Sequence, residues 1–164
     1  MYIPNKPAKY GLKIEMKFDG GTRNMVDAMT YLGKATNTGG LPLREYVVKE
    51  LTRSIEGSNR NVTTDSWFTS TPLAKQLLQQ PFISTLIGTL RTNKREIPEE
   101  MKNYRGRVVG TCIFCYDGPL TLLSFKPKPS KMVYLLSSCD EKGTVKSTIK
   151  LPHIIEFYNN TEGE

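Results

Sequence analysis

Two aspartates stand at positions where a carboxylate could do chemistry. Asp19 follows an alternating run at residues 12–18, and Asp65 follows a short β-favouring run at residues 61–64. An aspartate at the end of a strand ordinarily caps a turn or a helix. If the two strands are neighbours in one sheet, the carboxylates meet at one edge, where a hard cation such as Mg²⁺ finds oxygen ligands. Two such ions about 4 Å apart suit phosphoryl transfer.

The elements around these aspartates predict a mixed α/β fold. Residues 12–19 and 25–32 alternate as strands, with a glycine turn between them. Residues 41–56 carry an apolar stripe at helical spacing, and residues 70–80 open on a hydroxyl cap followed by proline. Strands are predicted at residues 61–64 and 83–91, and two or three more are predicted within residues 108–136.

Composition restricts the class of protein without naming a function. The 164 residues suffice for one domain, or most of one, and 38% are hydrophobic. Net charge is +7, and residues 91–150 hold 12 Lys and Arg against 6 Asp and Glu. Such an excess permits phosphate binding, but it also suits a merely soluble basic surface.

Several classes of protein are not expected. No apolar run approaches the roughly 18 residues of a membrane span, and the N-terminus has no signal-peptide core. We therefore expect an intracellular protein with no membrane partner. The sequence contains no G-x-G-x-x-G motif and no P-loop, so no nucleotide cofactor is expected.

Three cysteines, Cys112, Cys115 and Cys139, raise the question of a metal or redox site. The first two match C-x-x-C by letter, but their surroundings predict a strand, in which an offset of three places the thiols on opposite faces. An odd count in an intracellular chain argues against a disulfide framework. We interpret them as buried strand cysteines, with a zinc or redox protein as a remote alternative.

Longer motifs carry a resemblance to a known family. The chain resembles the piggyBac family of DNA transposases, closely and over almost its full length. The matching runs are YIPNKPAKYGLKI, PLREYVVKELTRSIEGSNRNVTTDSWFTSTPLAKQLL, IGTLRTNKREIPEEMK, VGTCIFCYDGPLTLLSFKPKPSKMVYLLSSCDE and IIEFYNNTEGE. Single short matches would mean little, but all of them in order are highly specific.

The resemblance implies a fold and a division of the chain. The family's catalytic core resembles RNase H, with a β-rich insertion between its second and third acids. Residues 1–85 would then be part of that DDE transposase core, and residues 86–150 a basic β-rich insertion. Residues 151–164 would begin the return to the core.

The resemblance also implies catalytic and metal-binding roles for both aspartates. The family's first acid lies in a C-D-S-G-T type motif, and the matching run here is Phe18 to Thr22, with Phe for Cys and Gly for Ser. This run maps the first acid to Asp19. The second lies in N-x-T-x-D-x-[WF]-F-T-S, which maps it to Asp65. We expect both to bind Mg²⁺ or Mn²⁺, and we expect Trp67 and Phe68 to pack the following helix onto the sheet rather than stack on bases.

The third acid of the family departs from the pattern. In relatives it follows F-Y-N-x-T-K-G-G in a segment reading V-D, and here the run is FYNNTEGE, with Glu162 in place of the Lys and Glu164 in place of the second Gly. The matching Asp would fall about two residues beyond Glu164. The expectation is an incomplete catalytic core that keeps two of three acids and does not cut DNA alone.

Partners follow from the same resemblance. The family acts in the nucleus on DNA, at transposon ends and TTAA targets, with a homodimer expected in the full-length family. Six basic residues are the predicted DNA contacts, with a solvated loop as the alternative: Arg91, Lys94, Arg95, Lys126, Lys128 and Lys131. The alternative function is a non-catalytic DNA- or protein-binding module derived from a transposase.

Overall fold

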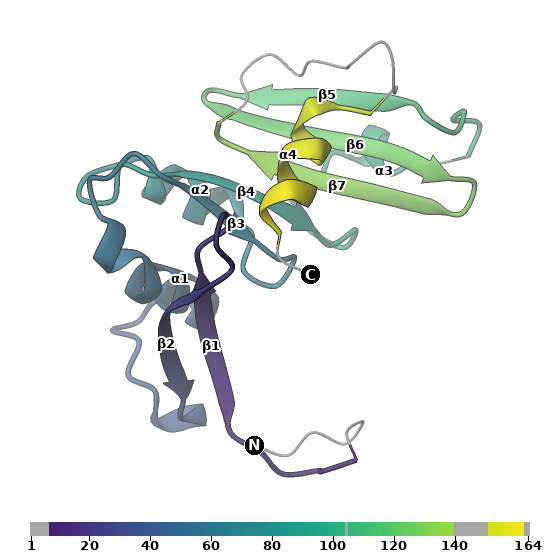
Figure 1. Ribbon diagram of the computed structural model, residues 1–164. Helices are drawn as coiled ribbons and strands as arrows, with labels where there is room; N and C mark the ends of the chain where they lie inside the picture. Colours follow the sequence, from purple (N-terminus) through teal and green to yellow (C-terminus); the bar gives the residue numbers. More distant parts are fainter. Residues whose placement is uncertain (1–6, 104, 140–150, 163–164) are drawn as a thin grey trace. The chain divides into compact units, whose positions relative to one another are not determined.

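The computed structural model describes residues 7–103, 105–139 and 151–162. The chain divides into two compact units, residues 1–54 and residues 55–164, and each is taken by itself (Figure 1). Among the described residues, no helix combines the length and the apolar character that crossing a membrane requires.

The first unit consists of a β-hairpin and a helix. Strand β1 (Lys13–Phe18) pairs antiparallel with β2 (Met25–Tyr31), and the register shifts between Lys17 and Phe18. A short 3-10 turn, η1 (Gly33–Ala35), precedes α1 (Leu43–Thr52), and a second, η2 (Arg53–Ile55), follows it. Lys17 donates from Nζ to the carbonyl of Leu51 at 2.6 Å. This places a cation at the C-terminal end of α1, where the helix dipole favours it.

The alternation of β1 is confirmed, but its charged side is the more buried one. Lys13, Glu15 and Lys17 are half-buried, whereas Leu12, Ile14, Met16 and Phe18 are 48–82% exposed. The lysine stems supply apolar surface of their own, so such residues can cover a neighbouring element while the charge stays near water.

The second unit is built on one five-stranded sheet of order β3-β4-β7-β6-β5. Strand β3 (Asn61–Thr64) runs parallel to β4 (Thr85–Leu90), as expected for strands joined through a helix, here α2 (Thr71–Leu77). Strands β5 (Cys112–Asp117), β6 (Leu120–Lys128) and β7 (Lys131–Ser137) form an antiparallel meander. β7 joins the meander to β4.

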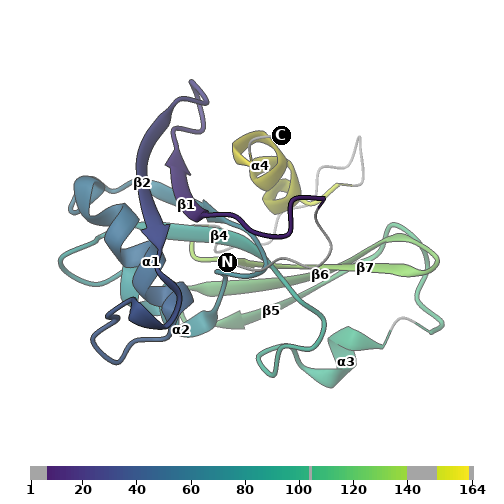
Figure 2. The same ribbon diagram turned by 90° about the horizontal axis from the view of Figure 1, so that it is seen from below.

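Both faces of this sheet are covered in part. Helix α4 (His153–Thr161) packs on one face, and the short α3 (Glu99–Lys102) lies on the other (Figure 2). The core beneath α4 joins residues of three strands, β4, β6 and β7, to one side of the helix: Ile87, Leu123, Phe125, Leu135, Ile154, Ile155 and Tyr158, with Cys112 and Phe114 of β5 packed against them. The sheet therefore depends on a helix about 65 residues further along the chain than β4.

The expected elements are largely confirmed, with changes at their ends. The expectation that the strands before Asp19 and Asp65 are neighbours in one sheet is wrong, because β1 pairs with β2 in a two-stranded sheet and β3 belongs to the five-stranded sheet. The helix predicted at 41–56 is α1 followed by η2, and that at 70–80 is α2, whose Ser70 cap accepts from the Leu73 amide at 3.3 Å. Residues 61–64 form the predicted strand. Strands β5–β7 share one sheet with β3 and β4. The expected boundary between the core and the insertion, after residue 85, therefore falls within this sheet, at the start of β4. Residues 140–150, at the end of the expected insertion, lie outside the described residues.

We predict that Ile154→Ala destabilises the second unit by about 2–5 kcal/mol, the usual cost of emptying a packed core position. Ile154 is 1% exposed between α4 and the sheet. Asn160→Ala, on the exposed side of the same helix, should change stability by no more than about 0.5 kcal/mol. Urea unfolding followed by circular dichroism measures both, and equal losses would contradict this packing.

Candidate functional site

Asp65 begins a tight turn directly after β3. Its Oδ1 atom accepts hydrogen bonds from the backbone amides of Trp67 at 2.9 Å and Phe68 at 3.3 Å. This is the Asx arrangement expected of a turn-forming aspartate. Asp65 is exposed, and among the described residues its Oδ2 atom has no hydrogen-bond partner. One oxygen thus fixes the carboxylate, and the other is available to a ligand.

The turn closes over a glycine. Thr69 donates from its amide to the Asp65 carbonyl at 3.1 Å and from Oγ1 to the same oxygen at 2.7 Å. The hydroxyls of Thr64 and Thr69 meet at 2.8 Å. A Cβ on Gly88, in the neighbouring strand, would lie 2.2 Å from Thr69 Oγ1 and 2.7 Å from the Thr64 carbonyl. Only glycine at position 88 leaves room for this turn, because real Cβ atoms do not approach other atoms so closely.

Asp19 has the same local geometry at the end of β1. Its Oδ1 atom accepts from the amides of Gly21 at 3.1 Å and Thr22 at 2.7 Å, and from the Thr22 hydroxyl at 2.9 Å. Both aspartates are therefore turn formers, as an aspartate at a strand end ordinarily is. For Asp65, forming the turn and binding a ligand are compatible, since its anchoring bonds use a single oxygen.

Two of the predicted DNA contacts lie beside the Asp65 turn. Because β3 and β4 are parallel, their C-terminal ends lie at the same edge of the sheet. Arg91 directly follows β4, is exposed, and approaches the Ser66 hydroxyl with Nε at 3.4 Å. Lys94 donates from Nζ to the Thr69 carbonyl at 3.3 Å. Arg95, next along the chain, is also exposed.

The hairpin between β6 and β7 extends from the same end of the sheet. β7 runs antiparallel to β4, so its first residues lie level with the end of β4. Lys128 and Lys131 face each other across this hairpin, and both are exposed. The end of the sheet that carries Asp65 thus also carries most of the predicted basic contacts.

Lys126 differs from the other predicted contacts because it is buried. It is only 7% exposed, and its Nζ atom donates to the Arg107 carbonyl at 2.7 Å. The Arg107 guanidinium in turn donates to the Ser124 hydroxyl at 2.8 Å and to the Ser124 carbonyl at 3.0 Å. Lys126 therefore fastens the segment before β5 onto the sheet. The structure leaves Lys128 and Lys131 as the exposed lysines of this hairpin.

The end of α4 lies against the C-terminal halves of β3 and β4. Thr63 donates from Oγ1 to Thr161 Oγ1 at 2.8 Å. Tyr158 donates from its hydroxyl to Glu162 Oε1 at 2.6 Å. Burial, followed by the bond to Glu162, raises the pKa of Tyr158, and the charge of Asp65 contributes in the same direction. Sequence reasoning missed these residues, because no local pattern marks a contact across 98 positions.

The aromatic pair after Asp65 packs ring on ring. The centroids of Trp67 and Phe68 are 4.7 Å apart, with the ring planes at 85°. Both side chains are half-buried. An edge-to-face contact of this kind is a favourable packing geometry for aromatic residues. It places the chain's single tryptophan two residues from Asp65, where its fluorescence can report on ligands.

Cys112 and Cys115 lie on opposite faces of β5, as their spacing in a strand predicted. Cys112 packs against the core beneath α4, and Cys115 lines a pocket on the opposite face. All three cysteines are free thiols, but the interpretation of them as buried strand residues is wrong: Cys112 and Cys115 are half-buried, and Cys139 is exposed and lies after the end of β7. Among the described residues, no group of three or more His, Cys, Asp or Glu is arranged to hold a metal ion.

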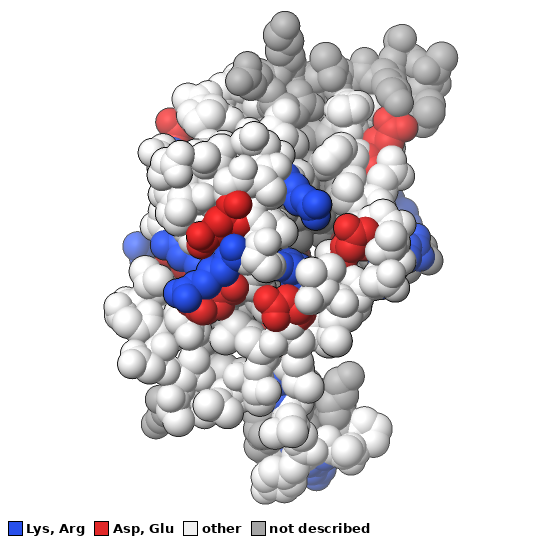
Figure 3. Space-filling view, turned by 60° about the vertical axis from the view of Figure 1, so that its left-hand side comes forward, with Lys and Arg blue, Asp and Glu red and all other residues white. Residues whose placement is uncertain are grey.

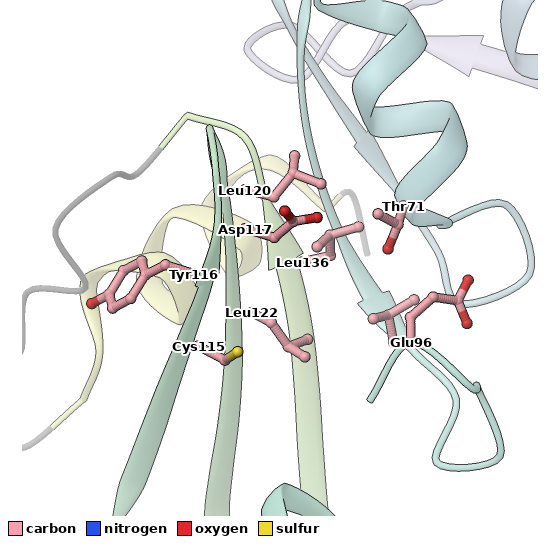
Figure 4. A pocket seen from close by; sticks show the side chains of 9 residues that line it. Thr71, Glu96, Cys115, Tyr116, Asp117, Leu120, Leu122 and Leu136 are labelled. Atoms are coloured by element: carbon pink, nitrogen blue, oxygen red, sulfur yellow. The ribbon is translucent and has the colours of Figure 1, made fainter. Parts of the chain in front are cut away.

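The pocket beside Cys115 is an uncovered part of the sheet. It has a volume of about 260 Å³. Leu120, Leu122 and Leu136 project from β6 and β7 on its floor, and Thr71 of α2 lies across from them (Figure 4). Its carboxylates are Glu96 and Asp117, and the latter pairs with Lys75 at 2.7 Å. An apolar floor without converging polar groups gives this pocket no catalytic chemistry of its own.

We predict that Gly88→Ala disrupts the Asp65 turn and lowers stability by about 1–3 kcal/mol, the typical cost of overpacking. Gly11→Ala is the control, because a Cβ there meets nothing within 4 Å. Thermal unfolding measures the cost, and the emission of Trp67 reports the change in the turn. A Gly88→Ala protein with unaltered stability and emission would contradict the close approach.

Comparison with known proteins agrees with this arrangement. A family model described as Transposase IS4 matches residues 1–164. A cryo-EM structure of a piggyBac transposase synaptic complex with hairpin DNA is similar to the chain, with a TM-score of 0.91 and 60% sequence identity. The match covers 98% of this chain and 34% of that one, so the chain spans about a third of that transposase's length. The expected RNase H-like fold class is confirmed, and the chain belongs to the Transposase IS4 family, in its piggyBac type.

Proposed function

We propose that this chain is part of a DNA transposase catalytic domain in which Asp19 and Asp65 bind divalent cations and the basic residues beside Asp65 contact DNA phosphates. The observation that carries the proposal is the Asp65 turn, an anchored carboxylate with Arg91 and Lys94 at the same end of one sheet. The similar transposase was solved with hairpin DNA, which supports DNA as the partner.

The two aspartates suit a hard cation. Mg²⁺ and Mn²⁺ take carboxylate oxygens, and Mg²⁺ usually binds one or two carboxylates together with substrate phosphate. In both aspartates the anchoring hydrogen bonds converge on Oδ1. The carboxylate is thereby oriented before any cation arrives. When bound, such ions stabilise the charge that develops on the attacking and leaving oxygens in phosphoryl transfer.

The residues around Asp65 would hold the nucleic acid. Arg91 can present its guanidinium to a phosphate, a geometry in which arginine gives paired hydrogen bonds. Lys128 and Lys131 add point charges on the hairpin that extends from the same end of the sheet. On the side of the molecule drawn in Figure 3, basic and acidic side chains are interspersed. No continuous basic surface is seen on that side.

The finer parts of the proposal come from the family resemblance. They are Mg²⁺ as the physiological ion, transposon ends and TTAA sites as substrates, a homodimer and a nuclear location. The alternative, a non-catalytic module that binds DNA or protein, differs from this proposal in one measurable property. Such a module needs no cation at Asp65, so cation binding separates the two functions.

We predict that Asp65→Asn weakens Mn²⁺ binding by roughly tenfold, equivalent to about 1.4 kcal/mol. Quenching of Trp67 fluorescence and calorimetry both measure this affinity. Asp19→Asn should have a similar effect, and the double variant measures whether the two losses add. Asp27→Asn is the matched control, because Asp27 lies on β2 and accepts from the adjacent Ala28 amide. If all four variants bind Mn²⁺ as tightly as the wild-type chain, the non-catalytic module is favoured.

We predict that Arg91→Ala weakens binding to any DNA duplex, whatever its sequence, and lowers the salt slope of log K by about one, the signature of one lost phosphate contact. Arg60→Ala is the control, since Arg60 is exposed and precedes β3 at the opposite end of the same sheet. Fluorescence anisotropy at several salt concentrations measures both.

Lys128→Ala and Lys131→Ala should act like Arg91→Ala without loss of stability. Lys126→Met should instead lower stability, because the buried ammonium holds the Arg107 carbonyl. If Arg91→Ala and Arg60→Ala weaken binding equally, or if neither weakens it, DNA does not lie at this end of the sheet.

A further inference from the structure

We propose that Glu162 is an electrostatic gate on DNA at the Asp65 end of the sheet, opposing phosphate until a divalent cation neutralises the local carboxylates. The inference rests on the proposed function, since it assigns a regulatory role beside the same cation and DNA site. It makes DNA binding by this chain depend on the cation through a residue that is not itself one of the two aspartates.

Hydrogen bonds fix the position of Glu162. It directly follows α4, whose last residue, Thr161, is bonded to Thr63 of β3 at 2.8 Å. The Glu162 amide donates to the Tyr158 carbonyl at 2.7 Å, and the Tyr158 hydroxyl donates to Glu162 Oε1 at 2.6 Å. Backbone and side chain are therefore both tied to a tyrosine that is 5% exposed. Asp65 lies two residues beyond Thr63 on the same chain segment.

The carboxylate is held there against the preference of the helix. The C-terminal end of a helix carries partial negative charge and favours Lys or Arg, whereas a glutamate there is disfavoured by several tenths of a kcal/mol. The short bond from the buried Tyr158 hydroxyl offsets this, because a hydrogen bond to an ionised acceptor is stronger than one between neutral groups. A freely moving glutamate would turn toward bulk water, but this one stays at the end of the sheet.

Carboxylates and basic groups adjoin at this end of the sheet. Asp65 and Glu162 are negative, and Arg91 and Lys94 are positive, with the Lys94 ammonium directed to the Thr69 carbonyl. A phosphate approaching Arg91 therefore also meets two carboxylates. At a partly exposed surface one such repulsion amounts to about 1 kcal/mol over several ångströms. A divalent cation bound at Asp65 would offset the charge of these carboxylates and admit the phosphate.

The test compares DNA affinity with and without Mn²⁺, at constant ionic strength, on a short duplex of mixed sequence. We expect Mn²⁺ to strengthen binding by the wild-type chain. Glu162→Gln should bind DNA about fivefold more tightly in the absence of Mn²⁺, the equivalent of about 1 kcal/mol. The increase in DNA affinity that Mn²⁺ causes should be smaller in Glu162→Gln than in the wild-type chain by the same factor. Glu162→Lys should show the same change with a larger magnitude.

Two further variants separate the gate from a general charge effect. Glu56→Gln removes the same charge from the opposite end of the sheet, where Gly57 pairs with Phe82, and should behave like wild type. Tyr158→Phe keeps Glu162 but removes the hydrogen bond that holds its carboxylate. Its DNA affinity without Mn²⁺ should lie between those of the wild-type chain and Glu162→Gln. Circular dichroism of each variant establishes that it remains folded.

The outcomes distinguish this inference from the proposed function. If Arg91→Ala and Mn²⁺ alter DNA affinity but Glu162→Gln matches Glu56→Gln, the gate is overturned and the proposed function stands. A Mn²⁺ response that is undiminished in Glu162→Gln also overturns it. If neither Mn²⁺ nor Arg91→Ala alters DNA affinity, the proposed function itself fails.

Discussion

The Asp65 turn depends on the close approach of two backbone segments at Gly88. The hydroxyls of Thr64 and Thr69 meet above this glycine, and a single added methyl group would stand 2.2 Å from one of them. This contact packs the loop after β3 tightly against β4. The orientation of Asp65 at the end of β3 is fixed as a result. The same turn positions Ser66 and Thr69, which are the hydrogen-bond partners of Arg91 and Lys94.

The basic residues of the chain divide into two kinds once their burial is known. Lys126 is surrounded by protein and is bonded to the Arg107 carbonyl, so its charge serves the attachment of one loop. Lys128, two residues further on, is exposed on the hairpin with Lys131. A substitution that tests DNA binding must therefore be judged together with stability, because neighbouring lysines in one motif contribute to different properties of the protein.

Helix α4 links the core of the sheet to the candidate site. Ile154 and Ile155 bury one side of the helix against three strands, while Thr161, its last residue, is hydrogen-bonded to Thr63 near the end of β3. A change in how α4 packs on the sheet would move Glu162 relative to the sheet. The electrostatics at Asp65 are thus coupled to the packing of a helix that contains none of the predicted site residues.

Much of the architecture could be read from local patterns. The Asx turns at Asp19 and Asp65, the strand at residues 61–64 and the capped helix after Ser70 depend on neighbours within a few positions, which the sequence displays directly. Long motifs pointed to the family. Tertiary structure alone decided that Lys126 is buried, that Gly88 must lack a side chain, and that Tyr158 and Glu162 lie beside the Asp65 strand. Each of these depends on segments far apart in the chain that meet only when the sheet and α4 have packed, and side-chain types at one position carry no record of such neighbours.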